Sequence, residues 1–414
     1  MTQDEQPFTS VLLPAATVAL FSRDKDIRES FEALATDWRF ARVKLDVIEG
    51  DVETAISHYG SHAAPDLVIV QTEDINDGFS DRLEALGGKC SDQTDAIVIG
   101  PVNDVNLYRR LISMGVRDYL VKPVPTSLLA EDIAQTLLTQ LGTSDSRVIA
   151  VMGAKGGVGA TVISEALAHM MAEEMDQKTF ILDAAGGWST LSVGLSFEPA
   201  TTLAEATRAA AEQNEDALTR MIHKAGEKMF VLSSGGDVML EDNVDLPSFE
   251  TLLDYVMGLY PVVIIDLSGA TADLKRTALS RAHEIMLVAT PTLPCIRASR
   301  TLLQEIKELR GGREVDVDII LNMKGVCPKY EVAKQQIEEG LEKKISVAIP
   351  YNPDLFIQTE MEAKSLASMK GGAEILKPFT GLMSERLSLK TPGGKTASDD
   401  AGLSSFLKKL TKAS

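Results

Sequence analysis

Cysteine is scarce in this sequence. Three cysteines, Cys90, Cys295 and Cys327, are widely spaced among 414 residues. An odd number at such spacing excludes a disulfide framework, paired CxxC zinc sites and most iron–sulfur ligation. It fits the reducing environment of a cytoplasm.

Long apolar segments are missing as well. The longest near the start, Val11 to Phe21, contains Pro14 and is too short to span a bilayer. The first five residues include two acids and have no basic residue, unlike a signal peptide. We therefore expect a soluble, cytoplasmic protein.

Aromatic residues and positive charge are both low. Aromatics make up 5% of the chain, so Leu, Ile, Val, Ala and Met must fill the core. The 41 Lys and Arg stand against 60 Asp and Glu, a net charge of −19. This balance argues against a surface that grips nucleic-acid backbones without sequence preference.

What is present is an alternation of buried strand patterns with helical ones. Strand patterns lie at 18–21, 66–71, 96–101, 118–121, 148–153, 179–184, 229–234, 260–268, 285–290 and 317–322. Helical patterns lie between them, at 26–35, 107–115, 127–141, 161–174, 201–225, 246–258 and 298–310. Such alternation predicts an α/β protein with two doubly wound parallel sheets.

Composition then divides the chain. The predicted segments are an N-terminal extension (1–15), a first domain (16–141), a linker (142–146), a second domain (147–389) and a tail (390–414).

The sharpest motif is the glycine-rich stretch from Gly153 to Thr161, between a strand and a helix. Backbone N–H groups of such a loop, with the helix N-terminus, form a concave site for phosphates. Thr161 stands where a hydroxyl coordinates Mg²⁺. A dinucleotide fingerprint fits worse, because Val162 occupies a required glycine position. The alternative is a glycine-rich turn without a ligand.

The usual lysine before the final Thr is missing, because Ala160 stands there, while Lys155 lies early in the loop. This arrangement resembles the deviant Walker A motif of the ParA/MinD superfamily. The resemblance implies that Lys155 reaches the partner's nucleotide across an ATP-sandwiched dimer. Loss of a charge-assisted contact, typically worth about 1.5–3 kcal/mol, predicts weak ATP binding.

Two carboxylates extend the resemblance. Asp266 ends a strand pattern at a Walker B position and would act on Mg²⁺ through a water. The alternative for Asp266 is a strand-end acid that caps the next turn. Asp183 matches the first acid of the family's switch segment, whose second acid is replaced by Ala185. We therefore expect hydrolysis to be slow or absent, as in a weak ATPase or a pseudo-ATPase.

Asn322 matches the family's base-contacting position, although a turn residue is the simpler interpretation. The segment 291–297 lies where the family's nucleotide loop follows a strand. The resemblance thus assigns Lys155 and Asp183 to catalysis, and Thr161 and Asp266 to magnesium. It assigns these residues to ATP: Lys155, Gly156, Gly157, Val158, Gly159, Ala160, Thr161 and Asn322.

The first domain resembles a response-regulator receiver that has lost its phosphorylation site. Ser22 and Arg23 stand where receivers carry an acid pair, and Gln71 stands at the aspartate position. A carboxamide cannot accept a phosphoryl group as a carboxylate does. Gly100 replaces the switch hydroxyl, whereas the lysine at 122 is kept. We interpret this block as a docking or dimerising module.

Together the two blocks resemble the TadZ/CpaE pilus-assembly family over about residues 16–385. The resemblance implies a cytoplasmic protein that helps place a Flp/Tad type IV pilus machine at the cell pole. We expect an ATP- and Mg²⁺-binding homodimeric scaffold. The alternatives are an active ParA-type partitioning ATPase acting on DNA or other cargo, and a receiver-controlled signalling effector.

The tail carries five lysines and two aspartates, a net charge of +3. Apolar residues at helical spacing (Leu403, Phe406, Leu407 and Leu410) face a side with Lys408, Lys409 and Lys412. Such a short basic amphipathic helix would bind weakly to the inner face of the membrane. Docking on a partner and a solvated tail are the alternatives.

Overall fold

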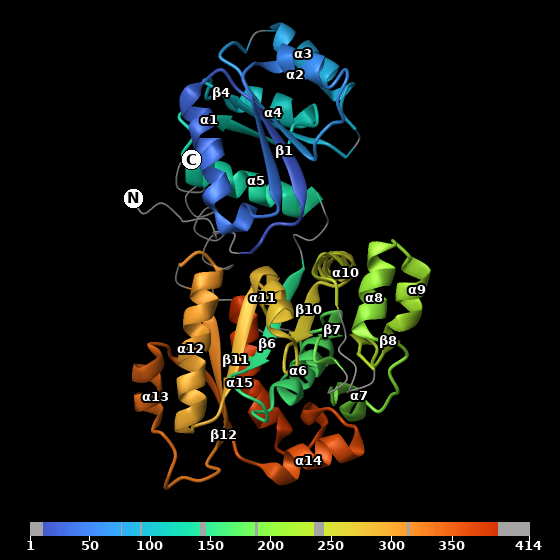
Figure 1. The fold of residues 1–414 in the computed structure, drawn as a ribbon, viewed down its shortest axis with the longest axis vertical. Coiled ribbons are helices and arrows are strands. Elements are labelled where there is room, and N and C mark those ends of the chain that lie inside the picture. The colour runs from blue at the N-terminus through green and yellow to red at the C-terminus, as the bar shows by residue number, and fades with distance from the viewer. Residues whose placement is uncertain are drawn as a thin grey trace, which may run out of the picture.

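The computed structural model describes residues 11–75, 77–91, 93–140, 146–186, 189–235, 244–312 and 315–387. Two mainly parallel sheets form two units, here called the N-terminal unit (11–140) and the C-terminal unit (146–387). Figure 1 shows the two units stacked along the long axis of the molecule. Most of the predicted extension and linker, and the whole predicted tail, lie outside the described residues.

The N-terminal unit has a five-stranded parallel sheet in the order β2-β1-β3-β4-β5. Its strands are β1 (Ala16–Phe21), β2 (Val43–Ile48), β3 (Leu67–Gln71), β4 (Asp95–Gly100) and β5 (Asp118–Val121). Its helices are α1 (Lys25–Glu32), α2 (Val52–His58), α3 (Asp77–Gly87), α4 (Val105–Ser113) and α5 (Thr126–Gln140). Helices α1 and α5 pack on one face of the sheet, and α2, α3 and α4 pack on the other.

The C-terminal unit has eight strands in the order β13-β12-β11-β6-β10-β7-β9-β8. They are β6 (Arg147–Gly153), β7 (Thr179–Asp183), β8 (His223–Lys224), β9 (Met229–Leu232), β10 (Val262–Asp266), β11 (Glu284–Ala289), β12 (Val317–Lys324) and β13 (Ile345–Pro350). All pairs are parallel except β8 with β9. The carboxyl end of β6 lies where the chain changes direction across the sheet, the usual ligand position in such folds.

Ten helices of the C-terminal unit are described. They are α6 (Ala160–His169), α7 (Leu191–Gly194), α8 (Leu203–Ala211), α9 (Glu215–Met221), α10 (Leu246–Leu259), α11 (Ala272–Arg281), α12 (Leu293–Leu309), α13 (Lys334–Leu341), α14 (Pro353–Glu362) and α15 (Gly372–Arg386). None of the described helices is long and apolar enough to cross a membrane.

The predicted fold class is confirmed, and some elements differ from the prediction. The single helix predicted over 201–225 is wrong: α8 ends before Gln213, which has a φ of 55°, and Asn214 caps a separate α9. Strands β2, β8 and β13 were not predicted. All three are edge strands: β2 mixes apolar with charged residues, β8 has two residues, and β13 contains Ser346 and ends at Pro350, so none of them has the sequence of a buried central strand.

The units meet at the amino-terminal edge of the larger sheet. The Leu12 N–H donates to the Ser280 carbonyl at the end of α11 (2.8 Å). The Arg42 guanidinium pairs with Glu250 of α10 at 2.6 Å. The Arg310 guanidinium lies 5.8 Å from the centre of the Trp38 ring. The N-terminal unit therefore sits on α10, on the end of α11 and just past the end of α12.

Candidate functional site

The glycine-rich loop connects β6 to α6 in the middle of the larger sheet. Gly157 and Gly159 have φ values of 76° and 89°, in the left-handed region that glycine adopts without strain. Gly159 is also the N-cap of α6 and supplies no side chain to the cap. The loop and the first turn of α6 therefore present free backbone N–H groups to an anion.

Asn322, at the end of β12, braces this loop. Its side-chain amide donates to the Val158 carbonyl (2.8 Å), and its Oδ1 accepts the Met323 N–H (2.8 Å). The side chain is buried, with 8% of its surface exposed. Asn322 thus lies beside the loop, and its side-chain amide fixes the position of the loop backbone.

Thr161 and Asp266 come together at the end of β10. The Thr161 hydroxyl donates to Ser268 Oγ (2.9 Å), and the Ser268 N–H donates to Asp266 Oδ1 (3.0 Å). Asp266 Oδ2 is buried without a hydrogen-bond partner among the described residues. Burial raises the pKa of Asp266, although the hydroxyl of Thr161 acts against this shift.

These groups fit a magnesium ion bound with a nucleotide. An unpartnered carboxylate oxygen beside a hydroxyl suits a hydrated Mg²⁺, which binds through few protein ligands plus phosphates. Within the described residues, no group of three or more His, Cys, Asp or Glu side chains could hold a metal alone. The ion would therefore depend on the nucleotide's phosphates.

Asp183 lies opposite Asp266 in the register of β7 and β10. Its Oδ1 accepts the Ala185 N–H (3.0 Å), and its Oδ2 accepts the Ser233 hydroxyl (2.8 Å). Burial raises the pKa of Asp183 to about 6, and the nearby Asp266 adds to the shift. The structure thus brings Asp183 and Asp266 onto neighbouring strands, with Asp183 engaged by hydrogen bonds.

The remaining predicted loop residues differ in exposure. Lys155, Gly156 and Gly157 are exposed, whereas Val158 and Ala160 are buried in the core of the C-terminal unit. Lys155 therefore stands at the surface, as a contact with another molecule requires. The expected nucleotide segment 291–297 begins beside the loop, because Val288 at the end of β11 accepts the Ala154 N–H (2.8 Å).

Glu165 was not singled out from the sequence. It lies one turn after Thr161 on α6, beside a cavity of about 30 Å³ that Thr161 and Glu360 also line. Burial raises the pKa of Glu165 to about 7, and Glu360 adds to the shift. Ser268 and Ser233 were also missed, since their contacts with Thr161 and Asp183 join distant parts of the chain. The one available signal was spacing: Ser268 follows Asp266 by two residues.

Exposed apolar side chains gather on the face that carries the loop. All follow the carboxyl ends of parallel strands or lie on helices that begin there. Large side chains in this set are Val162, Val193, Leu293, Val326, Tyr330, Tyr351, Ile357 and Met361. We call this set the loop-face ring. Exposed apolar side chains on one face of a protein suit an interaction site.

In the N-terminal unit, the position of a receiver's phosphorylation site holds an internal polar network. The Gln71 side chain accepts the Ser22 hydroxyl (3.1 Å) and donates to Glu73 (2.7 Å). Lys122 pairs with Glu73 (2.5 Å) and with Asp24. Lys122 lowers the pKa of Asp24, and both acids raise the pKa of Lys122. The lysine is therefore already neutralised by acids of this chain.

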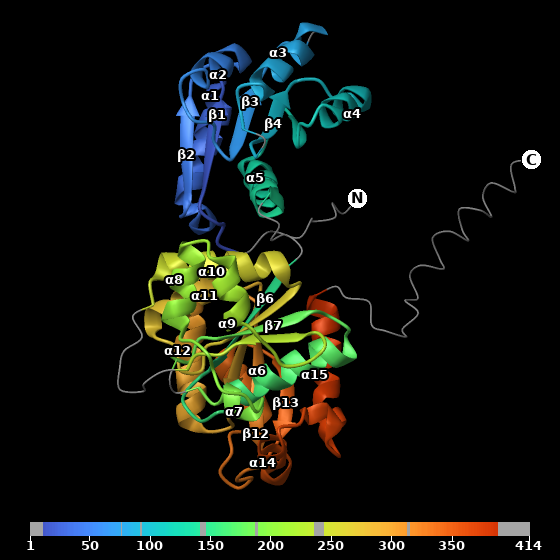
Figure 2. The ribbon, with the colours of Figure 1, turned by 90° about the vertical axis from the view of Figure 1, so that its right-hand side faces the viewer.

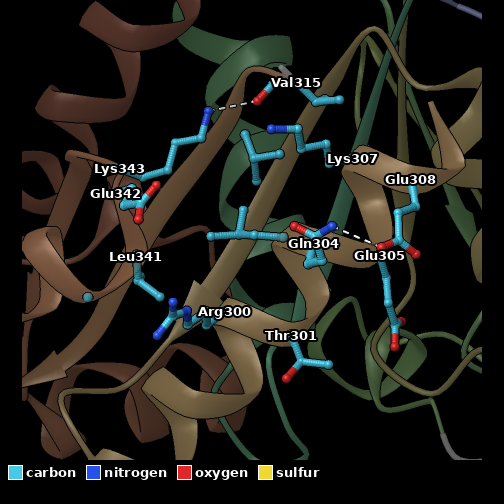
Figure 3. A pocket seen from close by; sticks show the side chains of 13 residues that line it. Arg300, Thr301, Gln304, Glu305, Lys307, Glu308, Val315, Leu341, Glu342 and Lys343 are labelled. Carbon is cyan, nitrogen blue, oxygen red and sulfur yellow. Dashed lines mark hydrogen bonds between the residues drawn. The ribbon is translucent and has the colours of Figure 1, made fainter. Parts of the chain in front are cut away.

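A second hollow is a groove of about 600 Å³ between α12, β12 and α13 (Figure 3). Arg300, Glu305 and Glu342 line it, so its charge is mixed. Some of its polar groups are bonded internally: Lys343 Nζ donates to the Val315 carbonyl at 2.8 Å. It shares no lining residue with the loop site.

Comparisons with known proteins agree with this geometry. Residues 146–319 match the model of an AAA domain family. The chain is 22% identical to a ParA family ATPase from Chlorobium tepidum, with a TM-score of 0.51, covering 57% of this chain and 98% of that one. This likeness shows the fold of the C-terminal unit.

Two pilus assembly proteins are also similar. A putative CpaE2 protein from Sinorhizobium meliloti is 35% identical, with a TM-score of 0.28, covering 29% of this chain and 98% of that one. CpaE from Caulobacter crescentus is 28% identical, with a TM-score of 0.30, covering 31% of this chain and 97% of that one. No curated protein matches the sequence.

Proposed function

Because this chain belongs to the CpaE-like family of pilus assembly proteins and carries a ParA/MinD-like AAA domain, we propose that it is a nucleotide-stabilised scaffold. It would act in the assembly and polar positioning of a Flp/Tad type IV pilus. One observation carries the proposal: the glycine-rich loop, Thr161 and Asp266 share one face with the loop-face ring.

Nucleotide binding would rest on backbone rather than on a lysine. Ala160 is buried under the loop and provides no charge, so the phosphates would meet the N–H groups of the loop and of α6. Thr161 and Asp266 would hold Mg²⁺, the latter through a water. When bound, the ion neutralises phosphate charge, and the protein residues orient it. We propose ATP as the nucleotide, with weak affinity.

Dimerisation would bury the loop face. Lys155 is exposed on the loop, and the loop-face ring lies on the same face of the sheet. A second copy would cover this ring and receive Lys155 at its own nucleotide. A charge-assisted hydrogen bond of this kind is worth about 1.5–3 kcal/mol, so nucleotide would shift the monomer–dimer equilibrium.

Hydrolysis would be slow or absent. Ala185 has no carboxylate to orient an attacking water, and Asp183 is engaged by the Ser233 hydroxyl and the Ala185 N–H. The nucleotide would therefore hold the dimer together more than it would drive a cycle.

The N-terminal unit would act as a docking module without phosphorylation. Gln71 is a poor nucleophile, and Lys122 is neutralised by Asp24 and Glu73. These contacts argue against a receiver-controlled signalling effector. The net charge of −19 argues against a partitioning ATPase that acts on DNA.

Titration with Mg-ATP tests the proposal. Light scattering would follow the mass of the protein, and a fluorescent ATP analogue would follow binding. We expect binding accompanied by a rise from monomer to dimer, which EDTA reverses. Binding without any rise in mass would contradict the dimeric scaffold, and an unchanged mass without binding would contradict the nucleotide site.

A further inference from the structure

A second exposed apolar patch lies on the N-terminal unit, away from the loop face. Val105, Tyr108 and Ile112 are exposed by 64%, 41% and 37%, and their spacing places them on one side of α4. Leu128, in the first turn of α5, is also exposed. We call these four residues the α4 strip. It borders β5, the edge strand of the sheet.

Two acids lie beside the strip. Asp118 begins β5 and Asp132 lies on α5, and both raise the pKa of the Tyr108 hydroxyl. Asp132 Oδ2 is buried with no hydrogen-bond partner among the described residues. Burial and Asp118 raise the pKa of Asp132 to about 7, and Arg117 offsets this only in part. A positively charged group placed here would stabilise the ionised carboxylates of Asp118 and Asp132.

The predicted tail contains a segment whose apolar and basic residues match the α4 strip and its two acids. Leu403, Phe406, Leu407 and Leu410 recur at helical spacing, with three lysines among them and after them. This is the anchor spacing with which an amphipathic helix binds an apolar surface. Residues 16–140 carry 12 Lys and Arg against 21 Asp and Glu, opposite in sign to the tail. The apolar pattern therefore fits, and the net charges of the unit and the tail are opposite, with Arg109 and Arg110 as the basic residues on α4 itself.

The described chain ends on the side of the larger sheet that faces the N-terminal unit. At the end of α15, Arg386 pairs with Asp318 (3.1 Å) and with Glu284 (3.9 Å), which stand at the amino-terminal edge of the larger sheet. This edge faces the N-terminal unit, and Figure 2 shows the end of α15 there. The fifteen residues 388–402 can span about 50 Å. A tether of this length gives the tail an effective concentration of about 1 mM.

We propose that the segment 403–412 docks in cis as a helix on the α4 strip, with its lysines toward Asp118 and Asp132. The segment thereby covers a surface that partners would otherwise use. This docking needs no nucleotide and is independent of the loop-face dimer.

Photo-cross-linking in the full chain tests the contact. Phe406 is replaced by p-benzoylphenylalanine, and Thr396 by the same probe as the control. We expect the probe at 406 to label peptides from 102–132 of its own chain, at monomer mass, with at least fivefold less labelling from 396. Labelling of the C-terminal unit, or cross-linked dimers, would overturn docking in cis.

Hydrogen exchange supplies a second readout. The amides of α4 should exchange at least fivefold faster in the Phe406→Ser chain than in the unmodified one, and Val105→Ser should abolish the cross-link. The control is Leu259→Ser, an exposed leucine on α10 that should change neither. If anionic phosphatidylglycerol vesicles abolish the α4 labelling and are labelled instead, the tail is a lipid anchor and the proposal fails.

Discussion

The side-chain amide of Asn322 lies 2.8 Å from the carbonyl oxygen of Val158 and donates a hydrogen bond to it. A Cβ atom on Gly159 would come within 2.6 Å of the same amide nitrogen. The glycine and the asparagine therefore depend on each other. Strand β12 fixes the shape of a glycine-rich loop that begins two strands away, after β6.

Asn322→Ala should loosen the loop. The Val158 carbonyl would lose its partner, which costs about 1–2 kcal/mol of stability. Affinity for a fluorescent ATP analogue should fall about tenfold, because the loop must then be ordered by the ligand. Asn214→Ala, which removes the N-cap of α9, is the control. It should lower stability by a similar amount and leave nucleotide affinity unchanged; equal affinities in the two variants would contradict the bracing role.

Lys155→Ala should weaken dimerisation in Mg-ATP by about tenfold or more, as expected for loss of a charge-assisted hydrogen bond. The lysine is exposed, so the melting temperature without nucleotide should not change. Sedimentation equilibrium gives the dimer constant, and Lys377→Ala on α15 is the exposed-lysine control. An unchanged constant in Lys155→Ala would rule out contact with the partner's nucleotide.

Gly100→Thr should destabilise the N-terminal unit. A Cβ at position 100 would lie 2.6 Å from the Tyr119 hydroxyl, which bonds the Val102 N–H (3.2 Å) and carbonyl (2.9 Å). The ring must move and both bonds are lost, so we expect a cost of about 2–3 kcal/mol in urea unfolding.

The control for Gly100→Thr is Gly87→Ala on α3. A Cβ there would meet no atom within 4 Å. Alanine favours the helix, so stability should rise by about 0.5–1 kcal/mol. Similar stability changes at the two positions would show that Tyr119 does not occupy the space beside Gly100.

Glu165→Gln should change how stability depends on pH. In the folded chain Glu165 holds its proton up to about pH 7, whereas the unfolded carboxyl loses it near pH 4.5. Between these values the folded state binds more protons, so the free energy of unfolding falls as pH rises. Glutamine removes this loss. The variant should be more stable by about 2–3 kcal/mol at pH 8 and equal to the unmodified chain below pH 4.5.

Urea unfolding between pH 4 and pH 8 measures this difference. The control is Glu305→Gln, an exposed glutamate on α12, which should follow the unmodified chain at every pH. If the free energies of unfolding of Glu165→Gln and the unmodified chain differ by a constant amount across this pH range, the raised pKa of Glu165 is contradicted.

Some features could be predicted because local sequence determines them. Buried runs such as LVIVQ in β3 and VVIID in β10 identify central parallel strands. The glycine-rich loop between β6 and α6 could be found because its conformation needs glycine at positive φ. Edge strands such as β2 could not be predicted, because one side faces water and the apolar run is interrupted.

The polar partners of the site could not be predicted. Ser268 is 107 residues from Thr161, and Ser233 is 50 residues from Asp183. Such pairs form only when neighbouring strands align, so one sequence gives no local sign of them. The burial of Glu165 likewise depends on α14, which contributes Glu360 from the far end of the chain.

The N-terminal unit is attached at the sheet edge opposite the glycine-rich loop, through Leu12, Arg42 and Trp38. In the proposed dimer, two copies would join by their loop faces. The particle would then be an elongated rod with one N-terminal unit at each tip. Each N-terminal unit would bind one partner at its end of the rod. Nucleotide bound at the central interface would then decide whether the two partners are held at a fixed separation, so the protein would work as a spacer.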